Sequence, residues 1–148
     1  MLKGLNPLLN ADVLYALRAM GHGDDLIIVD TNFPLETVAR QTTLGHPLRI
    51  DRGTADVVRA VLSVYPIDTF VDDAAARMEV VGEPETLMPV MEEVQSEVKS
   101  VGGPTLMGIE RFAFYERAKQ GFAVLQTSER RFYGCFALRK GVIQPDAP

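Results

Sequence analysis

Residues that form disulfides or bind metals are scarce in this sequence, which has one cysteine, two histidines and no tryptophan among 148 residues. The single Cys135 cannot form an intramolecular disulfide. No histidines or cysteines are paired at a spacing such as Cys-x-x-Cys or His-x-x-x-His, which zinc sites commonly use. We therefore expect neither a disulfide framework nor a bound metal, and a free thiol favours a reducing, cytoplasmic location.

Long apolar runs and excess positive charge are also absent. No segment approaches the roughly 20 apolar residues that span a bilayer, and residues 1–10 lack the apolar stretch of a signal peptide. The chain has 15 Lys and Arg against 20 Asp and Glu, for a net charge of -5. Because no overall positive field attracts nucleic acid, we expect no nucleic-acid partner. The lack of long apolar runs leads us to expect a cytoplasmic protein with no membrane partner.

Motifs for nucleotide cofactors and covalent nucleophiles are missing as well. The glycines in residues 21–23 and 102–103 lack the pattern of a phosphate loop or a dinucleotide fingerprint. Ser63 and Ser128 lie in no nucleophile-elbow pattern, and Cys135 lies in an apolar run that is typical of a core. The sequence therefore predicts no organic cofactor and no covalent nucleophile.

What the sequence does have is an alternation of helical and strand patterns. Apolar periodicity and short branched blocks predict helices at 11–22, 35–40, 55–64, 84–98 and 111–120, and strands at 26–29, 48–50, 70–71, 78–81, 105–109, 122–126 and 132–138. Such alternation favours an α/β fold with a mostly parallel sheet flanked by helices. We expect a single domain over residues 1–148, with a short tail at residues 143–148.

Two polar residues near the first predicted strand are candidates for chemistry. Histidine transfers protons near neutral pH, and His22 follows a glycine at the end of the first predicted helix. Asp30 ends the apolar strand, and ligands of open α/β sheets usually bind at the carboxyl ends of strands. The pattern allows both side chains to meet in one pocket, although a surface role for His22 stays open. His46 fits a turn without a chemical role.

A second group of candidates lies in the aromatic segment 111–117 and just beyond it. Arg111 and Tyr115 are one helical turn apart, so they can form a polar binding pair. The neighbouring Phe112 and Phe114 fit core or interface positions, and Arg117 fits a solvated one. Tyr133 can pack its ring while offering its hydroxyl to a ligand.

Four motifs follow one another along the chain: Gly21-His22-Gly23-Asp24, the strand that ends in Asp30 with Phe33-Pro34 after it, Arg111-Phe112-Ala113-Phe114-Tyr115-Glu116-Arg117, and Tyr133-Gly134 before Lys140-Gly141-Val142. Together, in this order, they resemble the D-ribose pyranase and L-fucose mutarotase family, its fucose branch in particular. The similarity runs from Met1 to about Ile143.

The resemblance implies an α/β domain of the ribose pyranase type that assembles into a ring-shaped homodecamer, with sugar sites near subunit contacts and no metal or organic cofactor. It assigns the proton donor to His22 and sugar binding to Asp30, Arg111 and residues 133–135, which are Tyr133, Gly134 and Cys135. Tyr115 is expected to support them. Cys135 stands where the family usually has asparagine, and Asn32 where the fucose branch often has histidine.

The implied activity is that of an isomerase that interconverts the α and β anomers of a monosaccharide, with L-fucose as the expected substrate. An imidazole suits this reaction, because ring opening needs one proton given to the ring oxygen and one removed from the anomeric hydroxyl. Two alternatives stay open: a non-catalytic sugar-binding or assembly protein, and a mutarotase or pyranase for another sugar such as ribose. The lack of a phosphate-binding motif disfavours a phosphosugar enzyme.

Overall fold

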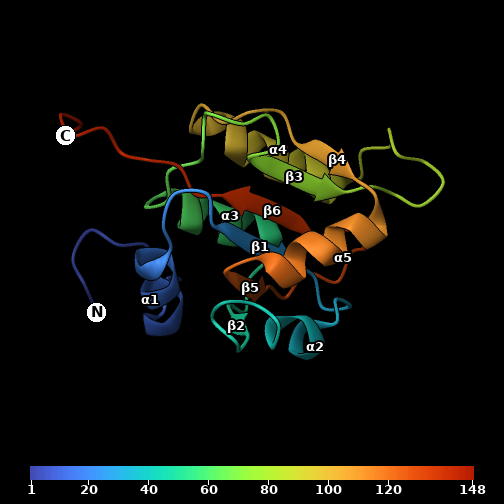
Figure 1. Cartoon of the computed structure of the whole chain (residues 1–148), viewed down its shortest axis with the longest axis horizontal. Coiled ribbons are helices and arrows are strands. Elements are labelled where there is room, and N and C mark those ends of the chain that lie inside the picture. The colour runs from blue at the N-terminus through green and yellow to red at the C-terminus, as the bar shows by residue number, and fades with distance from the viewer.

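One six-stranded sheet with helices on both faces forms the centre of the molecule (Figure 1), and the computed structural model describes residues 1–148. The helices are α1 (Ala11–Ala19), α2 (Leu35–Ala39), α3 (Thr54–Leu62), α4 (Pro89–Ser100) and α5 (Arg111–Gln120). The strands are β1 (Asp25–Val29), β2 (Leu48–Arg49), β3 (Ala75–Met78), β4 (Met107–Ile109), β5 (Ala123–Gln126) and β6 (Phe136–Arg139). Both chain termini lie beyond α1 at the same end of the molecule.

The strands are arranged in the order β2-β5-β1-β6-β3-β4. The pairs β2·β5, β5·β1 and β3·β4 are parallel, whereas β6 runs antiparallel to both β1 and β3. Residues 127–135, between β5 and β6, contain no crossover helix of the kind that a parallel connection requires. The predicted α/β fold with a mostly parallel sheet is confirmed, and β6 is its one reversed strand.

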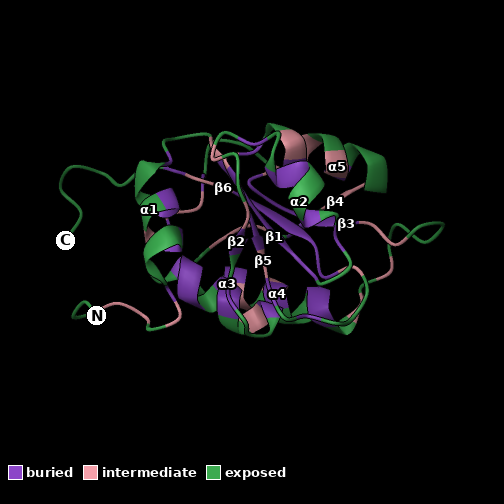
Figure 2. Cartoon of the chain, turned by 90° about the horizontal axis from the view of Figure 1, so that it is seen from below, coloured by how far each residue is buried: buried purple, intermediate pink, exposed green.

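Each face of the sheet carries its own apolar core (Figure 2). Helices α1, α3 and α4 cover one face, with a cluster of 25 buried residues, and α2 and α5 cover the other, with a cluster of 12. Within β1, Leu26 and Ile28 belong to the first cluster while Ile27 and Val29 belong to the second. Because strand side chains alternate between faces, this apolar strand is buried on both sides, as its composition predicts.

Several element boundaries differ from those expected. Helix α4 begins at Pro89 instead of residue 84, because proline fits the first turn of a helix and would break its interior. Helix α1 ends at Ala19 instead of residue 22, and the turn that follows contains Gly23, whose φ is 89°. Strand β3 lies at 75–78, earlier than the predicted 78–81, and Phe70 is exposed outside any strand.

Asp25, at the start of β1, forms the centre of an ion-pair network. Its carboxylate accepts hydrogen bonds from Arg117 at 2.8 and 3.0 Å and from Arg139 at 3.2 Å. The expectation of a solvated Arg117 is wrong, because α5 packs over β1 and leaves only 12% of that side chain exposed. Burial acts to raise the pKa of Asp25, but the two guanidinium groups outweigh it and hold the pKa below its ordinary value.

None of the five helices combines the length and the apolar character that crossing a membrane requires.

Candidate functional site

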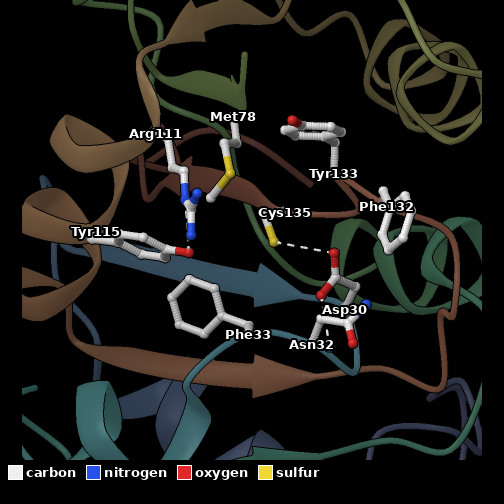
Figure 3. A pocket seen from close by; sticks show the side chains of 9 residues that line it. All are labelled: Asp30, Asn32, Phe33, Met78, Arg111, Tyr115, Phe132, Tyr133 and Cys135. Carbon is white, nitrogen blue, oxygen red and sulfur yellow. Dashed lines mark hydrogen bonds between the residues drawn. The ribbon is translucent and has the colours of Figure 1, made fainter. Parts of the chain in front are cut away.

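A pocket of about 400 Å³ opens at the edge of the sheet where β1 and β3 end (Figure 3). We refer to it as the Asp30 pocket; it is lined by Asp30, Asn32, Phe33, Met78, Arg111, Tyr115, Phe132, Tyr133 and Cys135. It therefore occupies the strand-end position where open α/β sheets usually bind ligands.

Asp30 is the most firmly held polar group of this pocket, and only 4% of it is exposed. One carboxylate oxygen accepts the backbone N–H of Asn32 at 2.9 Å, and the other accepts that of Gly134 at 3.1 Å. These bonds fix the carboxylate where the chain leaves β1. Since a carboxylate has about four lone-pair sites, acceptor capacity remains for a ligand hydroxyl.

Cys135 lies beside Asp30, with its Sγ atom 3.5 Å from a carboxylate oxygen. Burial raises the pKa of this thiol well above its ordinary value, and the neighbouring Asp30 charge raises it further. The thiol therefore stays protonated and serves as a weak donor to Asp30. The interpretation of Cys135 as an unreactive, core-type cysteine and its predicted place in the site are compatible, because it is buried and also lines the pocket.

Arg111 and Tyr115 form the predicted pair on one face of α5. The Arg111 Nε donates to the Tyr115 hydroxyl at 3.3 Å, and the guanidinium carbon lies 5.6 Å from the centre of that ring. Glu110 caps the helix by accepting the backbone N–H groups of Phe112 and Ala113 at 3.0 Å. Arg111 forms no ion pair, so its remaining N–H groups are free to donate to a ligand.

Tyr133 is held in an uncommon backbone conformation, with a φ of 62°. Left-handed residues other than glycine are infrequent and cluster at functional sites. The Tyr133 hydroxyl accepts the backbone N–H of Val81 at 3.2 Å, which fixes the ring across the pocket. The neighbouring Gly134 does not line the pocket, and its contribution is the N–H that holds Asp30.

Four residues that line the pocket were not predicted to contact a ligand: Asn32, Phe33, Met78 and Phe132. Asn32 and Phe33 follow Asp30 directly, so the strand-end rule could have identified them. Met78 ends β3, which β6 separates from β1, and the rule could not identify it because the predicted strand began at residue 78. Phe132 is 69% exposed at this site. We find no sequence signal that singles it out.

His22 does not lie in the Asp30 pocket. It precedes β1, whereas Asp30 follows β1, and the five residues of this strand separate the two by roughly 16 Å. The expectation that both side chains meet in one pocket of one chain is therefore wrong. An extended strand carries its two ends to opposite edges of the sheet, so closeness in sequence does not bring them together.

The partner of His22 is Asp68, a residue that the sequence did not point to. The His22 Nε2 atom lies 3.3 Å from an Asp68 carboxylate oxygen, and the imidazole packs edge-on against Phe70 with ring centres 5.5 Å apart. Asp68 is buried, and the backbone N–H of Phe70 lowers its pKa, with a further contribution from His22. The result is an oriented imidazole at an exposed edge, which we call the His22–Asp68 pair.

The loop beneath the pocket is held by Glu129. Its carboxylate accepts hydrogen bonds from Arg131 at 2.8 and 2.9 Å, and its carbonyl oxygen accepts the N–H of Thr31 at 2.9 Å. The bond from Arg131 is the main cause that lowers the pKa of Glu129 from 4.5 to about 2. Glu129 therefore stabilises the fold above its unfolded-state pKa, and this contribution is lost as the pH falls from about 4.5 to about 2.

We predict that Glu129→Gln makes the free energy of unfolding less dependent on pH in this window. Urea denaturation followed by far-ultraviolet circular dichroism between pH 2 and pH 6 measures the effect. The matched control is Glu116→Gln, since Glu116 is exposed and pairs only with Lys119. Parallel curves for wild type and Glu129→Gln across the window would contradict the prediction.

No three His, Cys, Asp or Glu side chains converge in an arrangement that could hold a metal ion. The chemistry available in the Asp30 pocket is thus that of a fixed carboxylate, a guanidinium, two phenol groups and an amide side chain. These groups position hydroxyl groups and exchange protons.

Comparison with known proteins yields one family. The sequence profile described as the RbsD / FucU transport protein family matches residues 3–143. The fucose mutarotase of Homo sapiens is 42% identical over 147 residues, which cover 96% of this chain and 94% of that protein.

Solved structures of similar proteins share this fold. The protein Atu2016 is 57% identical, with a TM-score of 0.94 and 97% of each chain covered. The fucose mutarotase of Streptococcus pneumoniae, solved in complex with L-fucose, is 27% identical with a TM-score of 0.86, and the match covers 97% of this chain and 100% of that one.

Proposed function

The chain belongs to the RbsD / FucU transport protein family, and from this premise we propose that it is an isomerase that interconverts the α and β anomers of L-fucose. Family membership confirms the resemblance inferred from the four sequence motifs. Relatives of 34–42% identity over nearly the whole chain are named fucose mutarotases. The activity of this chain is accordingly sugar mutarotation.

The observation that carries the proposal is the composition of the Asp30 pocket. It unites Asp30, Arg111 and Tyr133, three residues far apart in sequence that the family resemblance assigns to sugar binding. We assign sugar hydroxyls to the carboxylate of Asp30 and to the free N–H groups of Arg111. Tyr133 and Tyr115 position the sugar ring, and aromatic faces suit its C–H groups.

The reaction itself is a pair of proton transfers. A base removes the proton of the anomeric hydroxyl while an acid protonates the ring oxygen, the bond between C1 and that oxygen breaks, and an open-chain aldehyde forms. After rotation about the C1–C2 bond, the same transfers in reverse close the ring with the other configuration. Positioned general acid–base catalysis contributes roughly a hundredfold to ten-thousandfold to such a step.

We assign the proton donor to His22, and this assignment requires a second subunit. Within one chain His22 and the Asp30 pocket lie at opposite edges of the sheet, so a complete site needs the His22–Asp68 pair of one protomer placed at the pocket of its neighbour. Exposed aromatic residues lie at both places: Phe70 beside His22, Phe132 in the pocket wall, and Phe112 next to the pocket residue Tyr115. Such rings are typical of interface surfaces.

The ring-shaped homodecamer implied by the family is the assembly that we propose for these shared sites. Asp68 then acts as a positioning residue, because its carboxylate holds Nε2 of His22 and leaves the other ring nitrogen for the sugar. We further propose a single mutarotase domain over residues 1–148, with residues 143–148 as a tail, in the cytoplasm and without an organic cofactor.

Exchange spectroscopy by NMR tests the activity directly. Purified protein is expected to speed the exchange between the anomeric proton signals of L-fucose above the uncatalysed rate, with D-ribose, D-galactose and D-glucose as comparison sugars. The proposal fails if the protein accelerates none of the four. Saturable binding of L-fucose without faster exchange would instead identify a non-catalytic sugar-binding protein.

We predict that Asp30→Asn lowers the exchange rate of L-fucose by about tenfold to a hundredfold. The substitution keeps the shape of the side chain but removes the charge, and hydrogen bonds to charged groups contribute about 1.5–3 kcal/mol. Exchange spectroscopy at several sugar concentrations separates a binding defect from a rate defect. Asp51→Asn, at an exposed carboxylate after β2, is the control. Full activity of Asp30→Asn would refute the assignment.

A further inference from the structure

A second cavity, of about 600 Å³, lies between α4, the edge formed by β3 and β4, and the turn at residues 84–87. It is on the opposite face of the sheet from the Asp30 pocket, because Arg77 and Met78 alternate along β3 and only Met78 lines that pocket. We call it the Arg77 cavity. None of its lining residues takes part in the proposed mutarotase site.

Arg77 is an unusual residue to find in the middle of a strand, because only 6% of it is exposed and it forms no ion pair. Its Nη2 donates to the carbonyl oxygen of Pro84 at 2.8 Å, its Nη1 lies 3.9 Å from the sulfur of Met91, and its Nε has no partner. A buried guanidinium with so few acceptors is costly. The terminal nitrogens therefore offer unused donors to the cavity.

Three carboxylates face the same cavity, and they also lack partners. Glu79, Glu85 and Glu92 line it, and none of them forms an ion pair within the chain. A simple anion would be repelled by the three carboxylates, and a simple cation would meet the buried charge of Arg77. A neutral ligand with several hydroxyl groups suits both, because each hydroxyl donates one hydrogen bond and accepts others.

The remaining walls fit a ligand of this kind. Met91, Leu87 and Leu106 supply apolar surface for the C–H groups of a sugar ring. At Gly108 a Cβ atom would lie 3.0 Å from the Glu79 carboxylate and 3.3 Å from Nη2 of Arg77, so the glycine keeps the space between the two charged groups open. We propose that the Arg77 cavity is a second monosaccharide-binding site, separate from the catalytic one and independent of the proposed reaction.

Methionine methyl groups provide a reporter in each site, since Met91 lines the Arg77 cavity and Met78 lines the Asp30 pocket. In the full-length protein labelled with ¹³C at the methionine methyls, titration with L-fucose or D-galactose is expected to shift the Met91 signal in a saturable way. Arg77→Leu and Glu92→Gln should weaken that response by about tenfold, the loss that removing one charged hydrogen bond causes. The Met78 response should not change.

The control variant is Glu83→Gln, because Glu83 is an exposed carboxylate near the same turn that does not line the cavity. If Arg77→Leu does not fold, Glu92→Gln and Gly108→Ala still test sugar binding, because both residues line the Arg77 cavity. Three results would overturn the proposal. The Met91 signal would not shift with any sugar, it would shift with inorganic phosphate or spermidine instead, or it would shift with sugar to the same extent in Arg77→Leu or Glu92→Gln as in the wild type. If sugar shifts the Met91 signal but not the Met78 signal, and no mutarotation is measured, the proposed function is wrong but the proposed second sugar site is supported.

Discussion

His22→Ala is expected to lower the rate of L-fucose anomer exchange by about a hundredfold to ten-thousandfold, the contribution of a positioned general acid or base. Sugar binding should persist, because Asp30, Arg111 and Tyr133 lie in a pocket that His22 of the same chain does not line. Exchange spectroscopy gives the rate, and titration calorimetry gives the affinity. His46→Ala is the matched control, since His46 is an exposed turn residue whose ring forms a hydrogen bond only with the carbonyl oxygen of Pro47.

The same variant tests whether sites are shared between subunits. When His22→Ala chains are co-expressed with Asp30→Asn chains, random assembly of a ring restores both groups in about a quarter of the sites. Activity near a quarter of the wild-type rate is therefore expected from two weakly active parents. Mixed assemblies no more active than their parents would contradict a shared site, and full activity of His22→Ala alone would remove His22 from the mechanism.

Asp25→Ala is expected to lower the free energy of unfolding by about 3–5 kcal/mol, the cost of breaking a buried ion pair from one side. The substitution leaves two guanidinium groups, those of Arg117 and Arg139, without the carboxylate that each contacts within 3.2 Å. Urea denaturation at a fixed protein concentration measures the loss. L-fucose should still bind, because the Asp30 pocket lies at the other end of β1 from Asp25.

Asp73→Ala is the matched control, because it removes a carboxylate from the more exposed side of the same network. A pair of this kind contributes about 1 kcal/mol or less. The difference between wild type and Asp25→Ala should also shrink in acid, since Asp25 stabilises the fold above its unfolded-state pKa and loses this contribution as the pH falls through its lowered folded-state pKa. Equal losses for the two variants at neutral pH would contradict the network described here.

Local patterns in the sequence were sufficient to predict the fold class and part of the Asp30 pocket. Hydrophobic periodicity depends on residues a few positions apart, so it predicted most helices and strands and a largely parallel sheet. The change from the apolar residues 26–29 to Asp30 marked a strand end, which is where the pocket lies. Helical spacing alone brought Arg111 and Tyr115 together.

Contacts between distant residues were decided by the tertiary structure. His22 and Asp68 are 46 residues apart, Asp25 and Arg117 are 92 apart, and Asp30 and Gly134 are 104 apart. No local pattern encodes such pairs, since each depends on which elements the two cores place side by side. The unpaired Arg77 likewise became visible only once β3 was seen to be buried beneath α4.

His22 itself shows both sides of this division. Its scarcity and its place in a family motif were properties of the sequence, and they singled it out as the candidate proton donor. Its location relative to Asp30 was not a property of the sequence. The eight positions from His22 to Asp30 include the whole of β1, and an extended strand places its two ends far apart, at opposite edges of the sheet. The sequence by itself determined the candidates His22, Asp30, Arg111 and Tyr133, because their residue types and motifs are local properties. Only the tertiary structure decided that one chain holds His22 and the Asp30 pocket at opposite ends of β1.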